Sequence, residues 1–253
     1  MTNENSFGND TETSGDKFPV THWSAIVAAS SDNAAQRDRA LEVLANSYWR
    51  PIYKYLRVKW NKSSEDAKDL TQAFFVKAIE KGYFGSYDPA KSRFRTFIRV
   101  CVDGFISNEH KSAGRIKRGG DVMLVSLAYD AAEMELSCSA IQVPDTPDEY
   151  FEKEWIRSFF AQALDALRQE CESSGRALHY ALFEEYYIDG SAKKVSYEDL
   201  AAAHRLTVIN VTNYLASARR RFRKIIMERL IAITGNEQEF RQDARLLLGV
   251  ETK

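Results

Sequence analysis

Two stretches of the chain combine basic side chains with residues suited to nucleic acid. Between residues 91 and 120, eight lysines and arginines stand against two acids, a net charge of +6. Phe94, Phe97 and Phe105 lie among these cations. Cations hold phosphates and rings stack on unpaired bases, so this composition favours binding to single-stranded or opened nucleic acid. The alternative is a core helix with a charged, solvated face, in which the phenylalanines are simply buried.

The second basic stretch, residues 205–229, carries seven cations and one acid, again a net charge of +6. Ser196 and Thr207 are suited to cap two successive helices joined by a short turn. Apolar residues of the second helix follow a 4-3-4-3 spacing: Val211, Leu215, Ala218, Phe222 and Ile225. Its polar face offers Asn213 for adenine and Arg220 for guanine. This pattern is typical of a helix-turn-helix, and an ordinary helical hairpin is the alternative.

Residue patterns that mark enzymes and metal sites are missing from the sequence. Four histidines lie without paired ligand spacing: His22, His110, His179 and His204. Three cysteines form no CxxC pair: Cys101, Cys138 and Cys171. There is no GxxxxGK[ST] loop and no GxSxG elbow. We therefore expect no enzymatic activity, no metal and no cofactor, and free thiols in a reducing cytoplasm. No long apolar run is present, so we expect no membrane segment.

The spacing of apolar residues predicts an all-α fold, because strand patterns are scarce. Expected helices cover residues 35–55, a segment opened by Ser63, residues 93–112, a segment from 150, residues 176–187, two helices within 196–233, and residues 237–248. Pro51 predicts a kink or break in the first of these helices. In the helix opened by Ser63, the spacing turns Phe74 inward.

An acidic segment separates the two basic stretches. Residues 121–155 hold nine acids and one lysine, a net charge of −8, so the overall charge of −1 hides two basic stretches around an acidic one. With Pro144 and Pro147, this segment predicts a linker between two small helical domains. The expected divisions are a disordered tail over 1–17, a first domain over 18–120, the linker over 121–149, a helix-turn-helix domain over 150–235 and an amphipathic extension over 236–253.

Motifs in both halves resemble bacterial extracytoplasmic-function (ECF) sigma factors. VSYEDLAAAHRLTVINVTNYLASARRRFRKII resembles region 4 of that family. In the first half, YWRPIYKYLR resembles region 2.1, SEDAKDLTQAFFVKAIEK region 2.2, and FGSYDPAKSRFRTFIRVCVDGFISNEHKSAGRIKRGG regions 2.3 and 2.4. The flanking segments FPVTHWSAIVAAS and EQEFRQDARLLLG look like those of a subgroup with extended termini. The resemblance covers roughly residues 18–248, with the motifs in the family's order.

The resemblance implies a sigma factor that binds core RNA polymerase, at the clamp of its largest subunit and at its flap, and directs it to promoter DNA. The implied core-binding residues are Glu65, Asp66, Asp69, Leu70, Gln72 and Phe75. The implied minus-ten residues are Arg93, Phe94, Arg95, Thr96, Phe97, Arg99, Asn108 and Lys111. The implied minus-thirty-five residues are Thr207, Thr212, Asn213, Ser217, Arg219 and Arg220. The acidic linker would follow the path of nascent RNA, and the loop 82–88 would hold a flipped base.

Five positions depart from the family's pattern, two of them in the minus-ten region: Phe97 stands where a tryptophan is common, and Gly104 where an asparagine is common. Arg205 stands where a glycine is usual in the turn, and a positive φ there costs a non-glycine residue free energy. His204 replaces a leucine, and Lys68 interrupts the acids of region 2.2.

Other functions and partners stay open at the level of sequence. A helix-turn-helix regulator that binds duplex DNA without polymerase explains residues 196–229, but it gives no role to residues 65–75. An anti-sigma factor or a Ser/Thr kinase is a possible regulator. Phosphate on Ser63, Ser64 or Thr71 would add negative charge beside Asp66 and Asp69.

Overall fold

The computed structural model of the protein describes residues 25–111, 128–138, 146–189 and 195–249. Within these ranges every regular element is helical, as the sequence predicts. The elements are α1 (Ala25–Ala28), α2 (Ala34–Val58), α3 (Ser64–Glu80), the short 3-10 helix η1 (Tyr83–Ser86), α4 (Phe94–Lys111), α5 (Tyr129–Cys138), α6 (Pro147–Ser173), α7 (Ala177–Tyr187), α8 (Tyr197–His204), α9 (Val208–Ile233) and α10 (Glu237–Leu248). None of the helices in the described ranges is long and apolar enough to cross a membrane.

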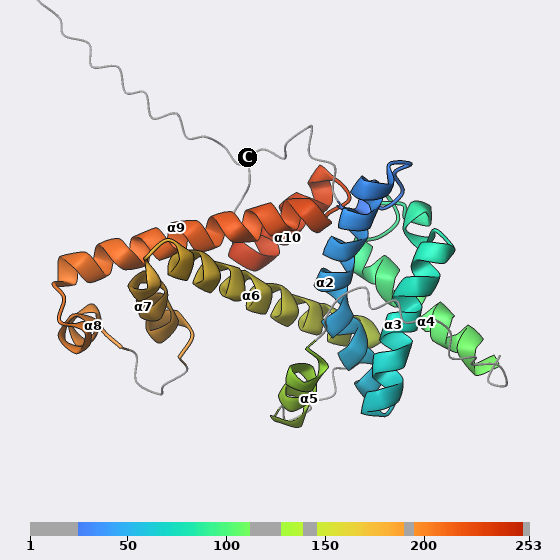
Figure 1. Cartoon of the computed structure of the whole chain (residues 1–253), viewed down its shortest axis with the longest axis horizontal. Helices are drawn as coiled ribbons and strands as arrows, with labels where there is room; N and C mark the ends of the chain where they lie inside the picture. The colour runs from blue at the N-terminus through green and yellow to red at the C-terminus, as the bar shows by residue number, and fades with distance from the viewer. Residues whose placement is uncertain (1–24, 112–127, 139–145, 190–194, 250–253) are drawn as a thin grey trace, which may run out of the picture.

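Two long helices, α6 and α9, run side by side through the molecule and connect its two ends (Figure 1). Helices α2, α3 and α4 gather at one end, and α7 and α8 lie at the other. Although the sequence assigns α6 to the second domain, it packs against α2 and α4 as well as against α7 and α9. The division into two sigma-type domains therefore stays a prediction.

Helix α2 is the central element of the first end. Its apolar stripe, predicted from the 3-4-4-3 spacing, is buried throughout: Leu41, Leu44, Tyr48, Ile52 and Tyr55. The prediction of a helix break at Pro51 is wrong, since α2 continues to Val58. Proline removes one backbone hydrogen bond. Burial of Trp49 and Tyr53 on either side of Pro51 compensates for that loss.

Helix α6 begins earlier than the sequence predicts. Thr146 accepts a hydrogen bond from the backbone N–H of Glu149 (3.2 Å), and the Glu149 carboxylate accepts one from the N–H of Thr146 (3.1 Å). This capping box is followed by Pro147 at the first helical position, where proline's missing N–H is harmless. Pro147 therefore starts a helix rather than ending one.

Part of the expected acidic linker is a helix docked on α2. The Tyr129 ring of α5 lies 5.1 Å from the ring centroids of both Trp49 and Tyr53. Glu133 accepts a hydrogen bond from the Tyr53 hydroxyl (2.6 Å) and pairs with the Arg57 guanidinium. The hydrogen bond from Arg57 lowers the pKa of Glu133 to about 2. Residues 129–138 of the expected linker thus form a helix, and its carboxylates have basic partners on α2 and α3.

Candidate nucleic-acid interface

The α8–α9 unit has the two helix caps and the short turn that the sequence predicts. The Ser196 hydroxyl accepts from the backbone N–H of Asp199 (3.1 Å), and the Thr207 hydroxyl accepts from that of Asn210 (3.1 Å). Between the helices, Arg205 is left-handed with φ 54° and ψ 44°. The turn thus keeps the left-handed backbone conformation that glycine adopts easily. For an arginine this conformation costs about 1 kcal/mol.

Two histidines join the helices of this unit to α7. Nε2 of His204 lies 2.8 Å from Oε2 of Glu185 on α7, so the side chain that replaces a leucine joins α8 to α7 through a hydrogen bond. On the other side of α7, the His179 ring stacks on Tyr214 of α9, with centroids 4.3 Å apart. Burial lowers the pKa of His179, and Arg176 adds to this effect. These contacts fix α8 and α9 on α7.

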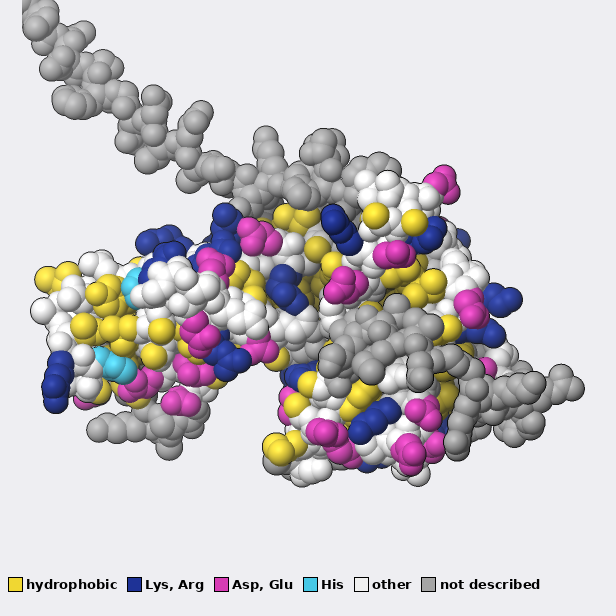
Figure 2. Space-filling model, in the orientation of Figure 1, with side chains coloured by type: hydrophobic (Ala, Val, Ile, Leu, Met, Phe, Trp, Pro, Cys, Tyr) yellow, Lys and Arg dark blue, Asp and Glu magenta, His cyan; other side chains and the backbone are white. Residues whose placement is uncertain are grey.

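One face of α9 presents most of the predicted minus-thirty-five residues to solvent. Thr207, Thr212, Asn213, Arg219 and Arg220 are exposed, and Ser217 is half-buried. Figure 2 shows basic side chains gathered along the upper edge of the view, over the middle of α9. Within the described ranges, Arg220 makes no hydrogen bond or ion pair. The opposite face of α9 is buried through Val211, Leu215 and Ala218.

Not every cation of α9 belongs to this exposed face. Arg221 pairs with Glu170 of α6. Arg229 donates a hydrogen bond to Gln162 of α6, and burial lowers its pKa. These two arginines therefore attach α9 to α6, whereas Arg219 and Arg220 are exposed near the middle of the helix.

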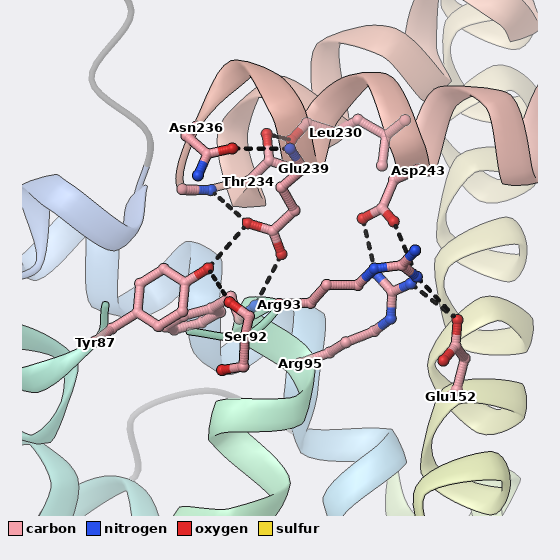
Figure 3. A network of polar contacts seen from close by, with 12 residues as sticks. Tyr87, Ser92, Arg93, Arg95, Glu152, Leu230, Thr234, Asn236, Glu239 and Asp243 are labelled. Carbon is pink, nitrogen blue, oxygen red and sulfur yellow. Dashed lines mark hydrogen bonds and ion pairs between the residues drawn. The ribbon is translucent and has the colours of Figure 1, made fainter. Parts of the chain in front are cut away.

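The arginines of α4 have a different environment, shown in Figure 3. Arg95 is only 2% exposed and donates to Asp243 of α10 (2.7 Å) and to Glu152 of α6 (2.9 Å). Its guanidinium also lies over the Trp155 ring, 4.5 Å from the centroid. The expectation that Arg95 faces DNA is therefore wrong for this arrangement of the helices, because α6 and α10 enclose it.

The neighbouring arginines are also paired with carboxylates. Nη1 of Arg93 lies 3.4 Å from Glu152 and 3.7 Å from Asp243. Arg99 pairs with Asp103 on its own helix and with Asp148 at the start of α6. All three predicted minus-ten arginines are thus neutralised within the chain.

The remaining predicted minus-ten residues divide between core and surface. Phe94 and Phe105 are buried, and Phe97 and Thr96 are half-buried, so the core interpretation holds for Phe94 and Phe105. Phe94 packs among the rings of Tyr48, Phe84 and Tyr87 because these all face one core. Asn108 is exposed. The side chain of Lys111 lies outside the described residues.

Glu239 of α10 connects the start of α4 to the loop before it. Its carboxylate accepts hydrogen bonds from the backbone N–H of Phe94 (2.8 Å), the Tyr87 hydroxyl (3.1 Å) and the N–H of Gly235 (2.9 Å), as Figure 3 shows. The Tyr87 hydroxyl also lies 3.0 Å from the carbonyl oxygen of Ser92. Burial and the Glu239 charge raise the pKa of Tyr87. The loop expected to hold a flipped base is therefore bound to α10 in this structure.

Burial has opposite consequences for the two partners of the central ion pair. It raises the pKa of Asp243, although Arg95 acts in the other direction. Burial alone would lower the pKa of Arg95. The charges and hydrogen bonds of Asp243 and Glu152 outweigh this effect, so the pKa of Arg95 is raised. The arginine thus stays charged, and Asp243 depends on it to remain an anion inside the protein.

Helix α3 presents an acidic surface at its N-terminal end. Glu65, Asp66, Asp69 and Gln72 are exposed and Leu70 is half-buried, as a docking surface requires. Phe74 is buried, as predicted. Phe75 is also buried, at 4% exposure, so its expected role as an exposed contact is wrong here. The buried face of α3 is wide enough for both rings, which meet edge to face with centroids 5.4 Å apart.

Other side chains near this surface have internal partners. Lys68 pairs with Asp130 of α5 (3.3 Å) and lies over the Tyr129 ring, so the lysine that interrupts the acids is turned toward α5. Thr71 is buried and donates to the carbonyl oxygen of Ala67 (2.6 Å). Of the three residues named as possible phosphate acceptors, this one is inaccessible in the present arrangement.

Sequence reasoning missed the residues that cover α4. Glu239 and Asp243 are four residues apart, next to the buried Phe240 and Ala244 on the amphipathic helix α10. Acidic residues that flank the buried face of a helix indicate that a basic partner lies opposite them. It also missed Ile209, which is 72% exposed at the second position of α9 and lies off the buried stripe.

We compared the chain with models of protein families, with curated proteins and with solved structures, and none of them matches it.

Proposed function

We propose that this protein is a sigma factor of the extracytoplasmic-function type, which binds core RNA polymerase and directs it to promoter DNA. The observation that carries the proposal is the exposed face of α9, held by a helix-turn-helix geometry. Asn213 and Arg220 lie on that face, and their side chains match the hydrogen-bonding edges of adenine and guanine. The capped start of α9 and the exposed Thr207 are suited to a backbone phosphate.

A second surface supports a protein partner. The exposed acids of α3 form a negative patch next to the half-buried Leu70, at the far end of the molecule from α8. A patch of this kind suits a basic protein surface, where charge speeds encounter and a central apolar contact adds affinity. In the proposal this partner is the clamp of the polymerase, while α8 and α9 reach the upstream promoter element.

Reconstitution tests both surfaces. The protein mixed with core polymerase is expected to form a complex on size exclusion and to support run-off transcription from promoter fragments that the complex itself selects. Asp66→Lys is expected to abolish the complex, because it reverses a charge in the exposed first turn of α3. Asp38→Lys, an exposed charge reversal on α2, is the matched control. Failure of the wild-type protein to bind polymerase at low salt contradicts the proposal.

Base readout by α9 has its own test. Asn213→Ala is expected to relax sequence choice at one position of the upstream element, with a loss of about 1–3 kcal/mol of discrimination there. Arg220→Ala is expected to relax a different position and to reduce the salt dependence of binding. An equal loss of affinity on all sequences for both variants counts against base readout.

A stand-alone helix-turn-helix regulator is the second candidate. The observation that favours it is that the arginines at the start of α4 are covered by carboxylates, while Arg219 and Arg220 of α9 are exposed. It predicts tight, sequence-specific binding of duplex DNA by the protein alone. The sigma factor proposal instead predicts weak binding of duplex by the free protein and a large gain with polymerase.

A further inference from the structure

We propose that α10 is an internal competitor for the nucleic-acid-binding end of α4, so that the arrangement described above is a closed state. Its carboxylates occupy the positions that phosphate oxygens take when the end of α4 binds nucleic acid. This inference rests on the proposed role of α4 in nucleic-acid binding.

Three donors at the start of α4 converge on α10. The Asp243 carboxylate lies 2.7 Å from Nη1 of Arg95 and 3.7 Å from Nη1 of Arg93. The Glu239 carboxylate accepts from the N–H of Phe94 at 2.8 Å, the first amide of the helix. Glu152 of α6 completes the set of acids around the two guanidinium groups. The two guanidinium groups and the first amide at this end of α4 are therefore all in contact with carboxylates.

This donor set is chemically suited to phosphate. Guanidinium groups and the free amides at a helix N-terminus bind phosphate and carboxylate oxygens through the same charge-assisted hydrogen bonds. The set is also incompletely satisfied, since Nε of Arg95 is buried without a hydrogen-bond partner. A phosphate group has more oxygen atoms than a carboxylate, so one of them could accept a hydrogen bond from this Nε.

The ion pair itself adds little to the attachment of α10, which also buries Phe240 and Ala244. Desolvation of two buried charges offsets most of their mutual attraction, so a buried ion pair contributes little net stability. Helix α10 has only 12 residues and is joined to α9 by a short turn. A helix of this length depends on its packing for stability, and it can separate as a unit once its contacts are lost.

The turn itself offers a way to disturb the contact without changing any charge. A Cβ on Gly235 would lie 2.6 Å from the Tyr87 ring, whose hydroxyl is held by both Ser92 and Glu239. Gly235→Ala therefore forces the turn and the Tyr87 ring apart, at the point where α10 meets the loop before α4.

The experiment compares full-length variants for binding of a short fluorescent single-stranded oligonucleotide, without polymerase, by fluorescence anisotropy at low salt. Two variants open the closed state: Glu239→Gln with Asp243→Asn, and Gly235→Ala. The control is Glu42→Gln with Glu172→Gln, which also removes two negative charges but at exposed positions of α2 and α6, outside α10. Both opening variants are expected to bind about tenfold more tightly than wild type, as they would if closed molecules outnumber open ones about ten to one.

Attribution to α4 needs one further variant. Adding Arg93→Ala to the opened double variant is expected to remove most of the gain, since Arg93 is among the cations that become available. The inference is overturned if the opening variants bind no more tightly than wild type. It is equally overturned if the control double variant gains as much as they do.

Hydrogen exchange on the wild-type protein gives an independent result if an opening variant fails to fold. Saturating oligonucleotide is expected to accelerate amide exchange across residues 237–248, because α10 is displaced. Unchanged or slower exchange there contradicts displacement. Neither measurement uses polymerase. Failure of the sigma factor proposal would appear in the polymerase assays, and failure of this inference would appear here.

Discussion

Helices α4 and α9 lie in stretches of equal net charge, yet their cations have different environments. At the start of α4, the guanidinium groups of Arg93, Arg95 and Arg99 all pair with carboxylates from α6, from α10 or from α4 itself. On α9, Arg219 and Arg220 are exposed. The difference teaches that charge along a sequence indicates a potential for binding nucleic acid, while the fold decides which of the cations are available for it.

The largest expected effect comes from removing the most enclosed cation. Arg95→Ala leaves the buried Asp243 without its main partner. We expect the free energy of unfolding to fall by about 1–2 kcal/mol, because opening of α10 from a ten-to-one closed state returns the carboxylate to water. Arg220→Ala removes an exposed cation of α9 and is expected to change it by less than about 0.5 kcal/mol. Urea unfolding followed by circular dichroism measures both variants. If both variants lose the same free energy of unfolding, the arginines of α4 and α9 do not differ in their contribution to stability.

A third set of cations, on α2, shows whether covered charges stabilise the fold. The pKa of Glu133 is about 2 in the folded chain, mainly through Arg57, against an ordinary value of 4.5. Because the folded pKa is the lower one, the stabilisation is complete above pH 4.5 and is lost as the pH falls toward 2. Glu133 is partly solvated, so we expect about 1–2 kcal/mol.

Comparison of wild type with Glu133→Gln by urea unfolding measures this contribution. At neutral pH the variant is expected to be the less stable protein, and at pH 2 the two are expected to converge. A difference that stays constant across that range would mean that the Glu133–Arg57 pair is not its source.

The smallest expected effect lies in the turn before the exposed face of α9. Arg205 has φ 54°, a conformation that glycine adopts without a steric penalty. Arg205→Gly is expected to raise the free energy of unfolding by about 0.5 kcal/mol, since the greater freedom of glycine in the unfolded chain offsets part of the gain. Thermal unfolding with Arg205→Ala as control measures it. An equal gain with alanine would assign the effect to loss of the side chain.

Local features of this protein could be predicted from its sequence. The caps at Ser63, Ser196 and Thr207 bond to amides three residues away, so their whole interaction is contained in a few letters of sequence. The exposed and buried faces of α9 follow from its 4-3-4-3 spacing for the same reason.

Contacts between distant segments could not be predicted in this way. Arg95 and Asp243 are 148 residues apart, and nothing near either of them identifies the other. Pro51 is a comparable case, because the local rule predicts a break and packing from elsewhere in the chain overrides it. The positions of Phe75 and of residues 129–138 differ from expectation because α2 supplies surfaces that no short window of sequence reveals.

The 27-residue helix α6 also sets a length for the molecule. At a rise of 1.5 Å per residue it measures about 40 Å, which matches about twelve base pairs of duplex at 3.4 Å each. Since α6 packs near α4 at one end and along α9 toward the other, it acts as a ruler between the two basic regions. Under the proposed function, two DNA elements spaced more widely than this length would be reached together only if α6 leaves α2 or the DNA bends.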